Sequence, residues 1–219
     1  MHSVRIDERE VAMQDVFTWF AYAGTAVFAV SGAMVGLRKS MDVVGVCFVA
    51  TLTGVGGGTL RDLLLGASPV GWVLQPTDIG ICLTCAVLAC VFNNWLIGRR
   101  AQWLLYADAA GIALFAVLGA AKAEATFAHP LVAILFGAMS ACFGGLLRDI
   151  VCSEQPVLFR REIYVSAALL GAAVFTLLPV EIGFDGRAFA GLAAALLLRL
   201  CAIRWSWTLP FPKYREGAG

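Results

Sequence analysis

The stretch "GVGGGTLRDLLLG", residues Gly54 to Gly66, decides how this chain folds, because three consecutive glycines and an Arg-Asp pair interrupt an apolar segment. Glycine in a helix interior is less favourable than alanine by about 1 kcal/mol. Ionisable side chains inside apolar helices are also rare and usually functional. A helix that contains both features must use them for packing or for function.

The composition is that of a membrane protein. Of the 219 residues, 60% are hydrophobic and 14% are charged, whereas soluble domains average about 45–50% apolar and about 25% charged residues. A membrane-spanning helix needs about 20 apolar residues, and seven segments approach or exceed this length. They are Val16–Leu37, Val43–Gly66, Ile79–Ile97, Trp103–Ala121, Leu131–Cys152, Ile163–Gly183 and Ala188–Ile203. The expected partner is membrane lipid and not nucleic acid.

The cationic residues are distributed unequally between the two sides of the membrane. One side carries Arg38, Lys39, Arg99, Arg100, Arg160, Arg161, Arg204, Lys213 and Arg215. The other side carries Arg5, Arg9, Lys122 and Arg187. Because Lys and Arg are enriched in cytoplasmic loops, this asymmetry sets the orientation of a multi-pass membrane protein. Its polar N-terminal tail, residues 1–15, would lie outside, and its C-terminal tail, residues 206–219, would lie in the cytoplasm.

The chain contains an internal repeat with an offset of 87 residues. At this offset "GTAVFAVSGA" (Gly24–Ala33) aligns with "GIALFAVLGA" (Gly111–Ala120), and "GGTLRD" (Gly57–Asp62) aligns with "GGLLRD" (Gly144–Asp149). Between positions 20 and 70, 15 of 51 aligned pairs are identical. Two unrelated apolar helices would not keep so many identities in one register, so we infer a duplication.

Each copy contains three of the expected spans. The transmembrane domain, residues 16–205, then consists of repeat one at about 16–97, repeat two at about 103–183, and a seventh helix at about 187–205. Because three is an odd number, the second copy enters the membrane from the opposite face. The expected fold is an all-α membrane protein with two inverted three-helix repeats, an architecture that many transporters share. The alternative is a duplication that serves packing alone.

The glycines of the second and fifth spans have two interpretations. Gly54, Gly57 and Gly58 share a helical face, and small residues at such spacing let two helices approach closely in lipid. The triplet nevertheless has more glycines than a crossing needs, which favours a bend or local unwinding. The expected kink and path residues are Gly54, Gly56, Gly57, Gly58, Gly144 and Gly145.

Unwound backbone at membrane depth must be buried in protein or must line a water-filled cavity. Carbonyl oxygens freed there could replace part of the hydration shell of a cation. We therefore expect backbone cation sites near the glycine motifs, with Thr53 and Ser140 as further candidates for the lining.

The two Arg-Asp pairs are expected at the two mouths of the path. At a rise of about 1.5 Å per residue, Arg61 lies roughly 28 Å along the second span, and Asp62 follows it. By the inverted register, Arg148 and Asp149 lie at the opposite membrane face. Neighbouring residues on a helix do not face each other, so we expect each arginine to pair with a carboxylate of another span. The alternative is that each arginine only anchors its helix end.

The remaining polar residues show no arrangement that is typical of an enzyme active site. Asp108 is expected at the membrane interface, and Lys122 and Glu124 are expected to be solvated at a helix end. No nucleophile and base stand at a recognisable spacing, and the glycines lack the Lys-Ser/Thr of a phosphate-binding loop. No cofactor is expected apart from a permeant cation and lipid as a ligand.

Three motifs together resemble one family. "GGGTLRD" in the second span, "GGLLRD" in the fifth, and "FRREIYVSAALLGA" from Phe159 to Ala172 are similar to those of the prokaryotic TRIC family, the trimeric intracellular cation channels. The resemblance implies seven helices, a homotrimer and a potassium-permeable path in each protomer between kinked second and fifth helices. It also implies a bacterial inner-membrane location, and K⁺ as the ion at the backbone sites near the glycine motifs. The same bacterial family has also been described as a glycine transporter.

These inferences predict a channel for monovalent cations, chiefly K⁺. Arg61, Asp62, Arg148 and Asp149 would shape its mouths, and movement of an arginine through the membrane field would make opening depend on voltage. The alternative is a secondary transporter for a small zwitterion such as glycine. A third alternative is a structural subunit without transport activity.

Overall fold

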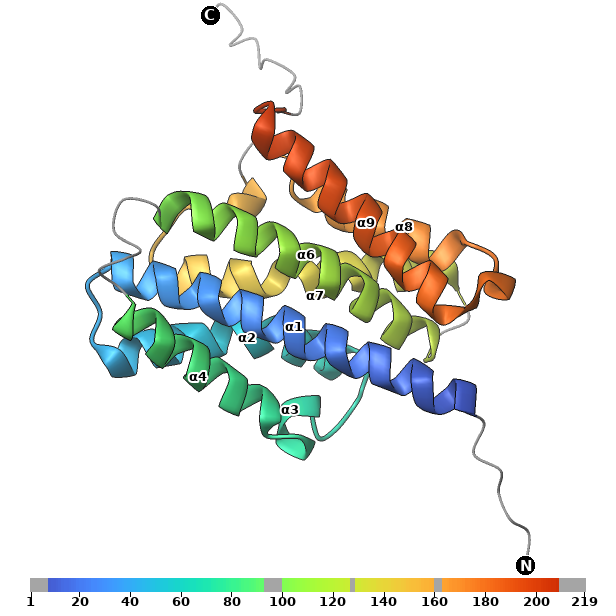
Figure 1. The fold of residues 1–219 in the computed structure, drawn as a ribbon, viewed down its shortest axis with the longest axis horizontal. Coiled ribbons are helices and arrows are strands. Elements are labelled where there is room, and N and C mark those ends of the chain that lie inside the picture. Colours follow the sequence, from blue (N-terminus) through green and yellow to red (C-terminus); the bar gives the residue numbers. More distant parts are fainter. Residues whose placement is uncertain (1–7, 93–99, 127–128, 160–162, 209–219) are drawn as a thin grey trace, which may run out of the picture.

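A computed structural model describes residues 8–92, 100–126, 129–159 and 163–208. Within these ranges the chain forms a bundle of α-helices (Figure 1). The α-helices are α1 (Glu8–Arg38), α2 (Val43–Leu64), α3 (Gly71–Leu74), α4 (Thr77–Val91), α6 (Arg100–Glu124), α7 (Pro130–Val151), α8 (Val165–Leu177) and α9 (Gly183–Arg204). Two 3-10 turns, Val157–Phe159 and Val180–Ile182, precede α8 and α9 respectively.

The N-termini of the two glycine-rich helices, α2 and α7, are set by local sequence features. The Asp42 side chain accepts a hydrogen bond from the Gly45 backbone N–H at 2.8 Å and so caps α2. Pro130 occupies the first turn of α7, where its missing N–H costs no helical hydrogen bond. Both helices therefore begin close to the predicted boundaries.

The long apolar helices fit a multi-pass membrane protein. Five helical segments of the described chain are long and apolar enough to cross a membrane, and the apolar helices α4 and α8 are shorter. Large apolar side chains such as Val44, Phe48 and Leu197 are exposed on the surface of the bundle, as expected for helices that face lipid.

Some boundaries differ from those expected. The helix α1 already begins at Glu8, within the predicted polar tail. The short α3 was not expected, and α8 ends at Leu177 because Pro179 follows and cannot continue the helix. The predicted end of the third span, residues 93–97, lies outside the described residues.

The helices are arranged around four central elements. In Figure 1, α4 covers one side of the bundle and α8 and α9 cover the other, with α1, α2, α6 and α7 between them. The helix α4 packs against α1 and α2, whereas α8 packs against α6 and α7. Equivalent helices of the two sequence repeats therefore have equivalent neighbours.

The contact between α1 and α6 is reciprocal: a glycine of each helix packs against a phenylalanine of the other, at aligned positions of the two repeats. A methyl group at Gly24 would lie 2.8 Å from the Phe115 ring, and one at Gly111 would lie 2.5 Å from the Phe28 ring. The two phenylalanine rings stack with their centroids 5.2 Å apart. Because residue 24 meets 115 and residue 28 meets 111, α1 and α6 run antiparallel.

The contact between α2 and α7 is reciprocal in the same way. A methyl group at Gly57 would lie 2.5 Å from the carbonyl oxygen of Ser140, and one at Gly144 would lie 2.5 Å from that of Thr53. A side chain at either glycine would therefore force the helices apart. The α2 and α7 helices cross in direct backbone contact and run antiparallel.

The glycine motifs remain helical. The α2 helix is continuous from Val43 to Leu64, and α7 is continuous from Pro130 to Val151. The expected local unwinding at Gly56 is therefore wrong, because the close crossing already accounts for glycines at this level. A bend without a break in either helix remains a prediction.

The ends of α2 and α7 are also equivalent. Gly66 and Ser153, which are 87 positions apart, both adopt positive φ angles, of 72° and 51°. The backbone N–H after each one returns to the carbonyl of Asp62 or Asp149, at 2.8 Å in both cases. This is the hydrogen bond of a Schellman motif, which ends the helix and satisfies its last carbonyl groups.

Candidate functional site

The first polar cluster lies at the C-terminal end of α2. The Arg61 guanidinium binds Asp62 Oδ1 through Nε at 2.8 Å and through a terminal nitrogen at 2.7 Å. The other terminal nitrogen lies 3.4 Å from the Ser140 hydroxyl of α7. For Arg61, the expectation of a salt bridge to another span is therefore wrong, because the long arginine side chain folds back onto its neighbour.

Asp62 has further partners from two other elements. Lys122 Nζ of α6 lies 2.8 Å from Asp62 Oδ1, and the Gly71 backbone N–H of α3 donates to Oδ2 at 3.1 Å. Lys122, which was expected to be solvated, keeps 32% of its side chain exposed, and its ammonium group also closes an ion-pair cluster with Arg61. Both oxygens of the Asp62 carboxylate are occupied.

The second cluster lies at the C-terminal end of α7 and is more deeply buried. Arg148 is 1% exposed, against 9% for Arg61. Its Nε binds Asp149 at 2.8 Å, and a terminal nitrogen binds Asp108 of α6 at 2.9 Å and also the Ser31 hydroxyl of α1. Arg148 therefore has the expected partner on another span. Asp108 is 4% exposed and lies between the helices of the bundle, and its position at the membrane interface stays a prediction.

Asp149 also repeats the role of Asp62. Its Oδ2 accepts a hydrogen bond from the Val157 backbone N–H at 3.1 Å. The two Arg-Asp pairs thus bind the backbone that follows α2 and α7, in addition to each other. This dual role explains why the Arg-Asp dipeptide occurs in both copies of the repeat.

Each cluster lines a small cavity. The cavity beside Arg61 has a volume of about 70 Å³, and its walls include Thr25, Gly58, Asp62 and Asp78. The cavity beside Arg148 has a volume of about 150 Å³ and is lined by Asp108, Asp149 and Glu154, among others. Because the two arginines stand at opposite ends of the antiparallel pair α2 and α7, the crossing separates the two cavities.

The expected glycine residues do not form one continuous surface. Gly57 and Gly144 form the crossing, and a methyl group at Gly56 would lie 2.8 Å from Leu147 of α7. Gly54 faces the Cys82 sulfur of α4 and also lines the smaller cavity. Gly58 opens toward Arg61, whereas Gly145 packs against the hydroxyl of Tyr164. Only some of the glycines therefore border a polar space.

Thr53 and Ser140 lie at the crossing itself. Both side chains are fully buried. The Thr53 hydroxyl donates to the Val49 carbonyl of its own helix at 2.7 Å, a common arrangement for threonine in helices. The Ser140 hydroxyl instead faces Arg61 of the opposite helix, so Ser140 connects the crossing with the smaller cavity.

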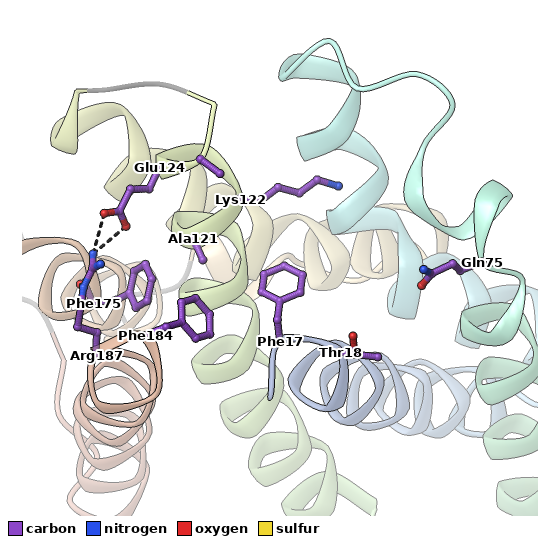
Figure 2. Close-up of a pocket in the computed structure, with 10 residues that line it drawn as sticks. Phe17, Thr18, Gln75, Ala121, Lys122, Glu124, Phe175, Phe184 and Arg187 are labelled. Atoms are coloured by element: carbon purple, nitrogen blue, oxygen red, sulfur yellow. Dashed lines mark hydrogen bonds and ion pairs between the residues drawn. The ribbon is translucent and has the colours of Figure 1, made fainter. Parts of the chain in front are cut away.

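A third, wider pocket adjoins the Arg61 cluster. It has a volume of about 730 Å³, and Phe17, Phe175, Phe184 and Lys122 contribute to its walls. Figure 2 shows Arg187 of α9 beside Glu124, with the lysine extending away from this pair. The arginine binds the Glu124 carboxylate oxygens at 2.8 and 2.7 Å.

Two buried arginines of α9 were not expected to be functional. Arg187 also donates to the Phe175 carbonyl at 2.9 Å and lies over the Phe175 ring. Arg199 is 2% exposed and donates to the Ile163 carbonyl at 3.2 Å. Their positions within an apolar helix were the signal that could have identified them. Both residues fix α9 against α8 and its entry.

The chemistry of the site is that of fixed ion pairs beside small polar cavities. Over the residues that the structure describes, no group of three or more His, Cys, Asp or Glu side chains is placed to hold a metal ion. The arrangement is an all-α membrane bundle with a charged cluster at each end of a close helix crossing.

Comparisons with known proteins place this bundle in a family. The model of the family described as Glycine transporter matches residues 18–94 and 105–179. The chain is 36% identical over 195 residues to the UPF0126 inner membrane protein YadS of Escherichia coli K12, covering 88% of this chain and 94% of that protein. It is 31% identical over 196 residues to the membrane protein YvgT of Bacillus subtilis, covering 88% of this chain and 94% of that one.

Solved structures agree in fold. A TRIC trimeric intracellular cation channel orthologue from Rhodobacter sphaeroides is 43% identical, with a TM-score of 0.83 over 88% of this chain and 99% of that one. A prokaryotic TRIC channel crystallised in 0.5 M KCl is 26% identical, with a TM-score of 0.84 over 90% of this chain and 100% of that one. The chain belongs to the TRIC family, whose sequence model is the one described as Glycine transporter.

Proposed function

We propose that this protein is a potassium-permeable channel for monovalent cations, with one path in each protomer where α2 and α7 cross. The observation that carries the proposal is the pair of polar cavities beside Arg61 and Arg148, at the two ends of this crossing. The solved relatives described as cation channels share the fold over nearly their whole length.

We infer that the two sequence repeats are related by inverted topology. The reciprocal contacts support this inference: Gly24 meets Phe115 while Gly111 meets Phe28, so that equivalent helices run antiparallel. With α4 and α8 counted as spans, the chain has seven, and the two repeats enter the membrane from opposite faces. Inverted repeats commonly place the transport path at their interface.

The ion pairs explain how arginines can stand beside a cation path. An unpaired guanidinium would repel K⁺, but Arg61 and Arg148 each bind the aspartate that follows them. In the described conformation Gly57 and Gly144 bring the two helices into direct contact. We therefore assign this conformation to a closed state, in which a separation of α2 from α7 would join the two cavities.

The proposed membrane orientation follows from the distribution of charge, and the proposed location follows from a relative. The excess of Lys and Arg on one side favours a cytoplasmic C-terminus and an external N-terminus. One relative is an inner membrane protein, which supports the same location here. The solved relatives include a trimeric channel, and we propose a homotrimer with lipid around it.

Recordings from purified protein in planar bilayers test the proposal. Discrete unitary currents in KCl, with a reversal potential that follows the K⁺ gradient, are the expected result. Saturable glycine uptake that is coupled to an ion, without unitary currents, would instead identify a secondary transporter. If neither flux appears in vesicles that contain correctly folded protein, the channel proposal is wrong.

A further inference from the structure

We propose that Asp78, at the start of α4, binds the permeant cation in the cavity beside Arg61. The inference rests on the proposed channel function and adds a cation-binding residue to it. Asp78 lies outside the repeated sequence motifs, and its role follows from its contacts alone.

The Asp78 carboxylate has one oxygen without a partner. Its Oδ1 atom is buried and accepts no hydrogen bond, although the Thr25 hydroxyl of α1 is hydrogen-bonded to the carboxylate. A buried carboxylate oxygen that lacks a partner is costly, because its lost hydration is not replaced. A cation in the adjoining cavity would remove this cost.

Asp62, the other carboxylate of the cavity, cannot serve in this way. Its Oδ1 is held by Arg61 and Lys122, and its Oδ2 accepts the Gly71 backbone N–H. Two positive groups therefore already neutralise Asp62. Of the two acidic side chains in this cavity wall, only Asp78 offers a free oxygen to a cation.

The cavity has the size and chemistry that such a site needs. A volume of about 70 Å³ exceeds the roughly 10–15 Å³ that one water molecule requires, so an ion can keep part of its hydration shell. Thr25 and Thr59 add hydroxyl oxygens to the wall. Because Arg61 lies in the same wall, binding at Asp78 is weak enough for the ion to leave again, as conduction requires.

In the described part of the chain, each carboxylate of the opposite cavity already binds a cationic side chain, and for Glu154 these partners are Arg38 and Lys39. Asp108 is bound by Arg148 and by the hydroxyl of Tyr164, and Asp149 accepts from Arg148 and Val157. Cation binding is therefore expected at one end of the path only. The two mouths, though built from the same repeat, differ in what they offer an ion.

The test compares unitary K⁺ conductance of the wild-type protein, Asp78→Asn and Asp185→Asn in planar bilayers. Asp185 is an exposed carboxylate in the first turn of α9, away from this cavity wall, so its variant controls for loss of one negative charge. Asp78→Asn should lower the conductance at least two-fold in dilute KCl, and the deficit should shrink as KCl rises. Asp185→Asn should conduct like the wild type.

A second measurement separates this inference from the channel proposal. K⁺ should raise the thermal unfolding temperature of the wild-type protein relative to choline, because a ligand that binds only the folded state stabilises it. Asp78→Asn should lose this K⁺-dependent shift, whereas Asp78→Glu should keep it. If Asp78→Asn does not elute as a folded protein, Asp78→Ser replaces it in both measurements.

The outcomes are distinct. Unchanged conductance at low KCl together with an unchanged K⁺-dependent shift overturns the role of Asp78 and leaves the channel proposal intact. A change in open probability alone, with normal unitary conductance, also overturns it and assigns Asp78 to gating. A wild-type protein without currents overturns the channel proposal, and the K⁺-dependent shift then decides whether the Asp78 site exists.

Discussion

The α-carbon of Gly57 faces the carbonyl oxygen of Ser140 so closely that a methyl group on it would lie 2.5 Å away. No side chain separates α2 from α7 at this point. The same relationship holds between Gly144 and Thr53. The close packing of α2 against α7 therefore requires glycine at both Gly57 and Gly144.

Gly57→Ala and Gly144→Ala should each destabilise the folded protein. Alanine favours a helix over glycine by about 1 kcal/mol, but overpacking a close contact costs typically 1–3 kcal/mol, so the net effect should be a loss. Gly80→Ala is the matched control, because a methyl group there meets nothing within 4 Å. Thermal unfolding in detergent should show lower midpoints for the first two variants and no loss for the third.

Arg148→Met should destabilise the protein more than Arg61→Met. Arg148 is almost fully buried and binds both Asp108 and Asp149, and removal of one partner from a buried ion pair costs roughly 3–5 kcal/mol. After Arg61→Met, Lys122 still neutralises Asp62. The free energy of unfolding, measured by denaturant titration in mixed micelles, should rank the two variants. Equal losses of unfolding free energy in the two variants would contradict the idea that the deeper burial and the additional ion pair of Arg148 make it more important for stability than Arg61.

A double variant tests the partner of Arg148. Adding Asp108→Asn to Arg148→Met removes one of the two carboxylates that the single variant leaves without their arginine. The double variant should therefore recover part of the lost unfolding free energy. An additive loss would show that Asp108 and Arg148 do not interact.

Ser153→Gly should stabilise the turn after α7. Ser153 has a φ of 51°, where its equivalent after α2 is Gly66 with a φ of 72°. A side chain in this left-handed region costs roughly 1–2 kcal/mol, partly offset by the greater freedom of glycine in the unfolded chain. The midpoint of thermal unfolding should rise for Ser153→Gly and fall for Gly66→Ala. The same direction of change in both variants would contradict this explanation.

Glu154 should make stability depend on pH below neutrality. The Lys39 ammonium hydrogen-bonds to this carboxylate at 2.9 Å and, with Arg38 at 3.1 Å, lowers its pKa below the usual value. A lowered folded-state pKa means that the stabilisation is present above the unfolded-state pKa and is lost as pH falls through the folded-state pKa.

The measurement compares unfolding midpoints of the wild type and Glu154→Gln at neutral pH and at acidic pH. The variant should be less stable at neutral pH, and the difference should shrink in acid. A difference that grows in acid would have the wrong sign for a paired carboxylate.

The sequence predicts the helices and the close crossing well, and it predicts the polar partners poorly. Helix positions follow from apolar runs of membrane length, and small residues at Gly57 and Gly144 already indicate a close approach. Local unwinding was wrong because helix propensity alone cannot show that a neighbouring helix occupies the space above a glycine. At Gly57 that neighbour stabilises the helix that glycine would otherwise weaken.

The polar partners depend on side-chain reach and on distant elements. Arg61 binds the adjacent Asp62 because a long guanidinium side chain can fold back, a freedom that helical spacing does not describe. Lys122 and Asp108 bind Asp62 and Arg148 because α6, a helix of the second repeat, packs against α1 of the first repeat as well as against α7. The internal repeat could not identify Asp78, because the aligned position in the second copy is Val165.

The stacked rings of Phe28 and Phe115 lie between α1 and α6, where each half of the molecule presents the same surface to the other. This is how the subunits of a two-fold symmetric dimer meet. The two halves differ where Lys122, Asp108 and Asp78 stand, because the aligned positions of the other copy are the apolar Val35, Ala21 and Val165.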